Sequence, residues 1–176
     1  MDILPSLQTG KQVVMLAPAA APAPTTHLIA QLGLRGAVTV LDGGNGFQAY
    51  RVLGLLRRQT VAVAAIATRI TIRRAFNCYQ MLALLESTPS RPQPHIVLDL
   101  LATFYDDHVT HREAQRLLRA SLHQLARLGQ VAPVVITLAP AKVAARAYLV
   151  QQVCQQADQC FTFQPPTQSA TQLRLI

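Results

Sequence analysis

The sequence predicts an α/β fold built on a mainly parallel β-sheet with helices on both faces. Short apolar runs such as VVITL at 134–138 alternate with longer amphipathic stretches, which is the pattern of repeated βαβ units. These runs are apolar at nearly every position, as expected for strands that are buried on both faces. A length of 176 residues suits one domain. We therefore predict a single domain over 1–176, with an N-terminal lead-in over 1–10.

The first half of the chain alternates strands with helices. Gly36 ends the first predicted helix, and the glycine-rich turn at 42–46 closes the second strand. The alanine-rich segment 61–67 is either a strand or part of a loop. The predicted strands cover 13–16, 37–41 and 70–72, and the predicted helices cover 26–34, 47–58 and 75–86.

The second half contains the clearest helix of the sequence, at 111–128. Its apolar face repeats at i, i+3, i+4 and i+7, and Thr110 stands at the N-cap position. The residues of that face are Ala114, Leu117, Leu118, Ser121, Leu122, Leu125 and Leu128. Around this helix we predict strands over 96–101 and 134–138, a helix over 141–157, and a C-terminal antiparallel hairpin that pairs 161–163 with 173–176 around the loop 164–171.

The segment after the first strand occupies the place of a phosphate-binding loop but lacks the residues that such a loop requires. A P-loop reads G-x-x-x-x-G-K-[ST] between a strand and a helix, and its glycine amides and lysine surround the phosphates. Here 13–27 reads VVMLAPAAAPAPTTH. If Thr25 takes the Ser/Thr position, Pro24 replaces the lysine, and proline has no N–H to donate to a phosphate.

The order of five segments resembles the ATPase core of the RecA/RadA recombinase superfamily, from about Gly10 to the C-terminus. The segments are VVMLAPAAAPAPTT, VTVLDGGNGF, IRRAFNCYQ, IVLDLLATFYDD and VVITLAP. The resemblance implies a RecA-like three-layer αβα sandwich. It also makes the first segment the P-loop, places the catalytic glutamate in the second, the Walker B aspartate in the fourth, and a γ-phosphate sensor at the end of the fifth.

Carried onto this chain, the resemblance implies an inactive ATPase. Pro24 stands at the Walker A lysine position, Gly44 at the catalytic glutamate position, and Leu138 and Ala139 at the sensor positions, whereas Asp99 retains the Walker B aspartate. Phosphoryl transfer depends on positioning and charge stabilisation, so we expect no catalytic residue, no bound metal and no cofactor. The expected vestigial nucleotide site comprises Pro24, Thr25, Thr26, Asp42, Gly44 and Asp99.

The positive charge of the chain indicates an anionic partner, either nucleic acid or an acidic protein surface. Net charge is +8, six arginines and no acidic residue lie between Gly43 and Leu85, and a second row of cations follows the helix 111–128. A generally basic surface with no dedicated ligand is the alternative. The candidate binding residues are Arg51, Arg57, Arg58, Arg73, Arg74, Arg112, Arg116, Arg119 and Arg127.

The remaining composition argues against extracellular and membrane classes. Three cysteines without a C-x-x-C motif define neither a disulfide framework nor a zinc site. No apolar run is long enough to cross a bilayer. We expect a cytoplasmic protein that does not bind a membrane.

These observations favour a catalytically inactive RecA-like paralogue that assists DNA recombination or repair. It would bind DNA, a RecA-like protein or another copy of itself. Two alternatives stay open. One is a protein-interaction regulator without DNA binding, of the kind that inhibits cell division or assists mutagenic DNA synthesis. The other is a nucleotide binder that does not hydrolyse, using Thr25, Thr26 and Asp99.

Overall fold

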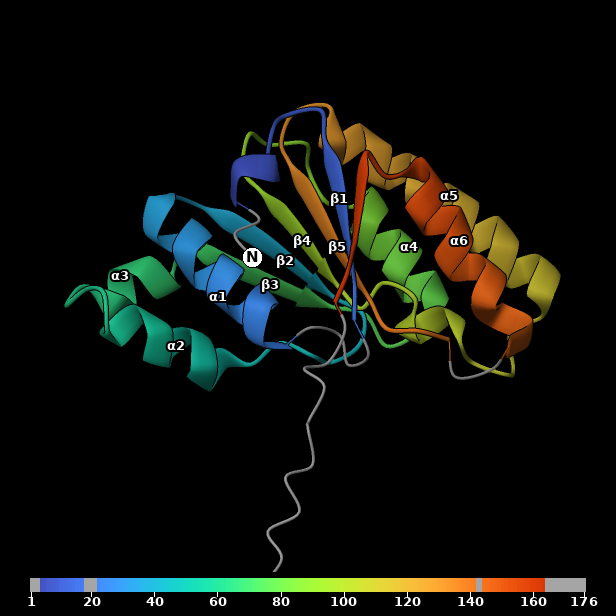
Figure 1. Ribbon diagram of the computed structural model, residues 1–176, viewed down its shortest axis with the longest axis horizontal. Helices are drawn as coiled ribbons and strands as arrows, with labels where there is room; N and C mark the ends of the chain where they lie inside the picture. Colours follow the sequence, from blue (N-terminus) through green and yellow to red (C-terminus); the bar gives the residue numbers. More distant parts are fainter. Residues whose placement is uncertain (1–3, 18–21, 142–143, 164–176) are drawn as a thin grey trace, which may run out of the picture.

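The computed structural model describes residues 4–17, 22–141 and 144–163. Its centre is a six-stranded sheet in the order β3-β2-β4-β5-β1-β6, in which every neighbouring pair is parallel (Figure 1). This confirms the predicted α/β class and parallel sheet. The strands are β1 Gln12–Leu16, β2 Val38–Asp42, β3 Ile70–Arg74, β4 His95–Leu98, β5 Val134–Leu138 and β6 Gln159–Thr162.

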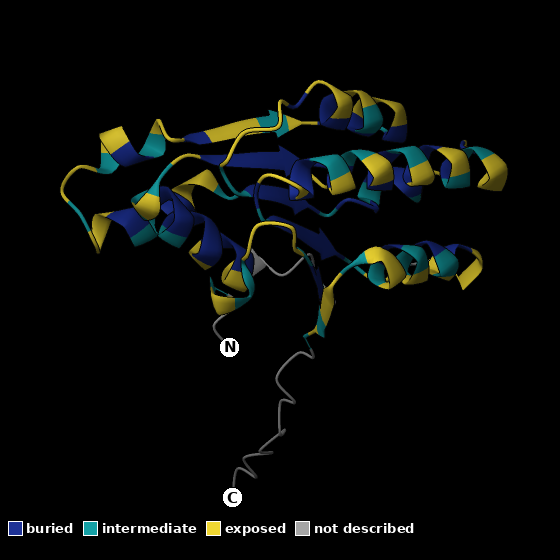
Figure 2. Ribbon diagram, turned by 90° about the horizontal axis from the view of Figure 1, so that it is seen from above, coloured by how far each residue is buried: buried dark blue, intermediate teal, exposed yellow. Residues whose placement is uncertain are grey.

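Helices cover both faces of the sheet and make three layers. Side chains alternate along each strand, so that Val13 and Met15 of β1 enter one core and Val14 enters the other. Figure 2 shows the buried strands between helices whose outer sides are exposed. One face carries α1 Pro22–Arg35, α2 Ala49–Arg57 and α3 Val63–Ala67, and the other carries α4 Cys78–Glu86, α5 His111–Gly129 and α6 Ala147–Gln156.

Helix α5 forms where its apolar periodicity placed it. All seven residues of the predicted face are buried, and they pack against α4 and the sheet. The Thr110 hydroxyl accepts a hydrogen bond from the Glu113 amide at 3.3 Å, so the predicted N-cap is confirmed. The helix ends at Gly129, one residue beyond the predicted boundary.

Several predicted boundaries or states were wrong. Helix α6 starts at Ala147 and not at residue 141, and α4 starts at Cys78 and not at residue 75. Three other differences have a clear local reason. Helix α1 starts at Pro22 and not at residue 26, because first-turn amides need no intrahelical acceptor and proline is tolerated there. The segment read as a strand or loop contains the short helix α3, since alanine favours helices. Strand β4 ends at Leu98 because Asp99 adopts a left-handed backbone with φ of 46°.

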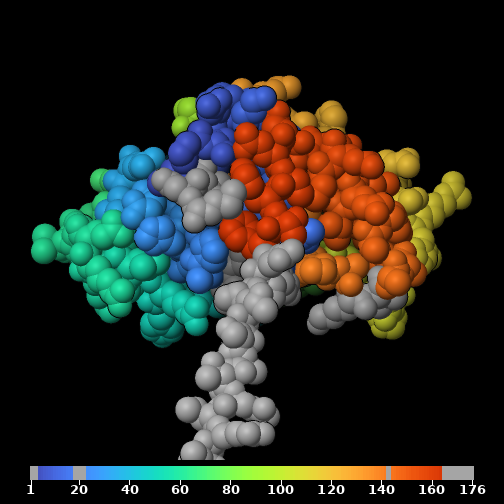
Figure 3. All heavy atoms as spheres, in the orientation of Figure 1, coloured from blue at the N-terminus to red at the C-terminus, as the bar shows by residue number. Residues whose placement is uncertain are grey.

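Strand β6 is the outermost strand on the β1 side and lies at the surface beside α6 (Figure 3). It runs parallel to β1, with Val14 opposite Cys160. Its predicted hairpin partner at 173–176 and the loop 164–171 lie outside the described residues, so that hairpin stays a prediction. Within the described ranges, no helix has the length and apolar character needed to cross a membrane.

Candidate functional site

The parallel topology brings the predicted vestigial site to one edge of the sheet. Strands β2, β4 and β5 end there, and α1 begins there. Helix α1 follows β1 on one face, whereas α6 follows the neighbouring β5 on the other. In α/β sheets, ligands bind where adjacent strands send their helices to opposite faces. The site therefore has the position of a ligand site, and its chemistry depends on the side chains present.

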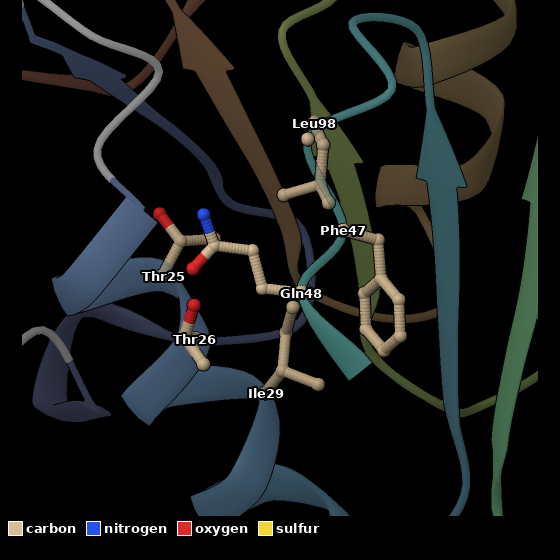
Figure 4. A pocket seen from close by; sticks show the side chains of 7 residues that line it. Thr25, Thr26, Ile29, Phe47, Gln48 and Leu98 are labelled. Carbon is tan, nitrogen blue, oxygen red and sulfur yellow. The ribbon is translucent and has the colours of Figure 1, made fainter. Parts of the chain in front are cut away.

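A small pocket separates α1 from the turn that follows β2. The Thr25 and Thr26 side chains are almost fully buried, and the Gln48 side chain extends toward them (Figure 4). Ile29 and Leu98 close the apolar side. The cavity volume of about 10 Å³ suits one water molecule, whereas ligand pockets occupy hundreds of Å³. Gln48 was not predicted, because nothing in its sequence context marks it.

Asp42 is buried at the end of β2, where it organises the glycine-rich turn. One carboxylate oxygen accepts from the Gly46 amide at 2.9 Å, and the other accepts from the Phe47 amide at 3.1 Å. The second oxygen also pairs with Arg74 Nε at 3.2 Å, because the β2–β3 register sets these two residues side by side. Asp42 therefore has a structural role that the sequence did not indicate.

Asp99 lies close to Ala139 and to Gly44, two of the positions singled out in the sequence. Its carboxylate accepts from the Ala139 amide at 3.3 Å, and its own amide donates to Thr137 Oγ1 at 2.8 Å. A Cβ at Gly44 would lie 2.7 Å from the Asp99 Cβ and 2.8 Å from Oδ2. A side chain at position 44 thus requires Asp99 to move, which accounts for a glycine at this position.

Tyr105 completes this edge, and no motif in the sequence marks it as a site residue. Its hydroxyl donates to the Ala139 carbonyl at 3.1 Å. Burial, with a smaller contribution from the Asp99 charge, raises the pKa of Tyr105 to about 12. The phenol therefore stays protonated at neutral pH and acts as a hydrogen-bond donor.

The described edge offers little of the chemistry that phosphoryl transfer needs. Pro24 is exposed in the first turn of α1 and supplies neither a charge nor an N–H. In the portion of the chain that the structure covers, no three His, Cys, Asp or Glu side chains gather closely enough to hold a metal ion. Of the predicted site residues, Thr25 and Thr26 line the small pocket, Gly44 lies beside Asp99, and Asp42 supports the turn that contains Gly44.

The arginines of α2 and of its C-cap, Arg58, are exposed and free of ion pairs with the described residues. Val52 and Leu56 turn toward the core, while Arg51, Arg57 and Arg58 face solvent. None of these three guanidinium groups makes a hydrogen bond or ion pair with a described residue. Tyr50, next to them, has a relative exposure of 92%.

The other predicted cations are partly engaged within the fold. Arg73 donates to Ser87 Oγ at 2.9 Å, and Arg116 binds both carboxylate oxygens of Glu113. Arg127 donates to the Leu85 and Thr88 carbonyls and holds the end of α4. The cationic row of α5 is consequently interrupted: only Arg112 and Arg119 of its four candidate arginines are exposed without a partner among the described residues.

No protein-family model matches this chain, and neither does any curated protein at a significant level.

Proposed function

We propose that this chain is a non-hydrolysing RecA-like protein that binds DNA and assists recombination or repair. The observation that carries the DNA part is the α2 basic face, defined as Tyr50, Arg51, Arg57 and Arg58. Three cations without a partner among the described residues and one exposed aromatic ring lie on this short helix and its C-cap. No acidic residue lies between Gly43 and Leu85 to neutralise them.

The absence of hydrolysis is supported by the residues at the sheet edge. Pro24 cannot donate a hydrogen bond to phosphate, and Asp99 occupies the space that a side chain at position 44 would need. The pocket beside Thr25 is too small for a nucleotide. The nucleotide-binder alternative is therefore less well supported than binding through the surface.

The α2 basic face suits a phosphate backbone. Arg51 and Arg58 are seven residues apart, which places them on the same side of the helix and about 10 Å apart along its axis. Between them, Gly54 has open space where a side chain would stand. Arginines in such a row replace the counterions of nucleic-acid phosphates, and an exposed tyrosine can stack on an unpaired base.

Fluorescence anisotropy with labelled single- and double-stranded DNA tests this function. Replacing Arg51, Arg57 and Arg58 by Gln should weaken binding at least about tenfold at about 50 mM salt. It should also reduce the slope of log K against log salt by about 2–3. The control is the replacement by Gln of Arg112 and Arg119, which are also exposed and without a partner among the described residues, and it should change affinity much less. Absence of binding by the wild type at low salt, or an equal loss in the control, would contradict the proposal.

A protein partner is the second candidate, favoured by an aromatic patch at the β3 edge of the sheet. Phe76 and Tyr79 have relative exposures of 74% and 52%, and Arg73 and Arg74 line the same groove as Phe76. Aromatic residues and arginine are enriched in protein interfaces. β3 pairs only with β2 in the described sheet, so its outer edge is open to a partner.

Capture of a purified RecA-like recombinase tests this candidate. Changing Phe76 and Tyr79 to Ser should abolish capture and leave DNA binding intact, because both side chains lie outside the α2 basic face. Capture that is unaffected by the double substitution would exclude this patch as the interface.

A further inference from the structure

Two cysteines that are distant from the candidate site lie against each other. Cys154, on α6, is half-buried, and Cys160, on β6, is exposed. Their sulfur atoms are 2.7 Å apart. A disulfide bond measures about 2.05 Å, so the sulfurs need to approach by only about 0.7 Å more to form one.

The fold creates this proximity. Helix α6 ends at Gln156, the chain turns at Ala157, and β6 then joins the sheet edge beside β1. Figure 3 shows β6 and α6 side by side at the surface. Asp158 fixes the turn, because it accepts hydrogen bonds from Lys11 Nζ at 2.9 Å and the Gln12 amide at 2.8 Å.

We propose that Cys154 and Cys160 are a site of reversible disulfide formation, with a low-molecular-weight disulfide such as oxidised glutathione as the oxidant. The third cysteine, Cys78, is fully buried in the core on α4 and takes no part. The proposal does not depend on DNA or partner binding.

The reaction proceeds by two thiol–disulfide exchanges. The Cys160 thiolate attacks the oxidant, forms a mixed disulfide and releases one small thiolate. The Cys154 thiol then loses its proton to solvent and attacks the Cys160 sulfur, which expels the second small thiolate. The two protein thiols are oxidised by two electrons in total, and the oxidant is reduced to two thiols.

The product would join the end of α6 covalently to the outermost strand. Within the described sheet, β6 pairs with β1 and with no other strand, so this bond would add a covalent restraint to an edge strand. The exposed Cys160 is accessible to the oxidant, and the half-buried Cys154 sits behind it as the resolving thiol.

Equilibration in mixtures of reduced and oxidised glutathione, followed by acid quenching, alkylation in denaturant and mass spectrometry, tests the proposal. The intact chain should lose about 2 Da and retain one alkylatable thiol, and peptide mapping should link Cys154 to Cys160. The Cys78→Ser variant should behave in the same way. Cys154→Ser should stop at one glutathione on Cys160.

A denatured control separates the effect of the fold from mere closeness in sequence. The native chain should form the internal bond at an oxidant ratio at least about tenfold lower than the chain in guanidinium. An equal ratio in both conditions would overturn the proposal. So would a wild type that yields only mixed disulfides or cross-linked dimers.

Discussion

Gly44 and Asp99 illustrate how one residue can exclude a side chain at another. A Cβ at Gly44 would meet only Asp99 at short range, at 2.7–2.8 Å. We expect Gly44→Ala to lower the free energy of unfolding by about 1–3 kcal/mol because Asp99 must shift. Urea unfolding measures this change in the free energy of unfolding. Gly46→Ala is the matched control in the same turn, since nothing lies within 4 Å of its added Cβ, and it should be nearly neutral.

The same contact gives a double-mutant test. Asp99→Gly removes every atom that the added Cβ would meet most closely, and glycine accepts the positive φ of 46° at this position. In the Asp99→Gly variant, Gly44→Ala should lower the free energy of unfolding by less than about 0.5 kcal/mol. A cost as large as in the wild type would show that another neighbour excludes the side chain.

His95 gives the fold a pH dependence in the mildly acidic range. Its side chain is fully buried in β4, and burial, with a smaller contribution from the Arg127 charge, lowers the pKa of His95 below the ordinary 6.5. The unfolded chain therefore binds a proton below pH 6.5 that the folded chain does not yet bind. The contribution of His95 to stability is complete above pH 6.5 and is lost as the pH falls toward the folded-state pKa.

We expect the His95 contribution to the free energy of unfolding to fall by at most about 1.4 kcal/mol per pH unit. Urea unfolding between pH 7.5 and 5.5 should show a steeper decline for the wild type than for His95→Leu. The control is His123→Gln, because His123 is exposed on α5, and its profile should follow the wild type. Parallel profiles for His95→Leu and wild type would contradict the assignment.

Among the elements, the start of α6 depends on one buried arginine. Arg146 ends the short helical turn Ala144–Arg146 that precedes α6, and its side chain is only 4% exposed. Its guanidinium donates to the Phe104 and Val109 carbonyls, the latter at 2.6 Å. These bonds join α6 to the segment between β4 and α5, two parts of the chain that are far apart in sequence.

Replacing Arg146 by Met should destabilise the protein by about 2–4 kcal/mol, because two buried carbonyls lose a charged donor. Thermal or urea unfolding measures the loss. Arg119→Met is the matched control, since Arg119 is exposed on α5 without a described partner, and it should change stability by less than about 0.5 kcal/mol. Similar losses of stability in both variants would mean that the Arg146 hydrogen bonds do not stabilise the fold.

For the molecule as a whole, the proposed loss of nucleotide binding has a thermodynamic signature. A ligand that binds only the folded state raises stability by RT ln(1 + [L]/Kd), or about 2.7 kcal/mol at a concentration a hundredfold above Kd. We expect millimolar ATP with Mg²⁺ to leave the melting temperature unchanged and to release no phosphate above background. Stabilisation that disappears in Thr25→Val or Asp99→Asn would instead establish the nucleotide-binding alternative.

Much of the architecture was predictable from local patterns. The repeat along α5 and the continuous apolar runs of β2 and β5 placed those elements to within one or two residues, because burial dictates residue type at each position. Prediction failed at α3, at the first turn of α1 and at the start of α6, where alanine and proline suit more than one backbone state. It also failed at the end of β4, where Asp99 leaves the extended conformation. For the candidate site, position was predictable and contacts were not: Gln48 and Tyr105 carry no local signal.

The sequence by itself determined the parallel α/β plan, the lack of glycine and lysine in the segment 13–27, and the excess of arginine. Each of these is a property of residue type and spacing. Only the tertiary structure decided which arginines are available. Strand register pairs Arg74 with Asp42, and the packing of α5 against α4 lets Arg127 bind the Leu85 carbonyl. The α2 arginines have no partner among the described residues. The tertiary structure also places Gly44 beside Asp99 and Cys154 beside Cys160. Such contacts depend on how the crossovers return each strand to the sheet, which no stretch of neighbouring residues specifies.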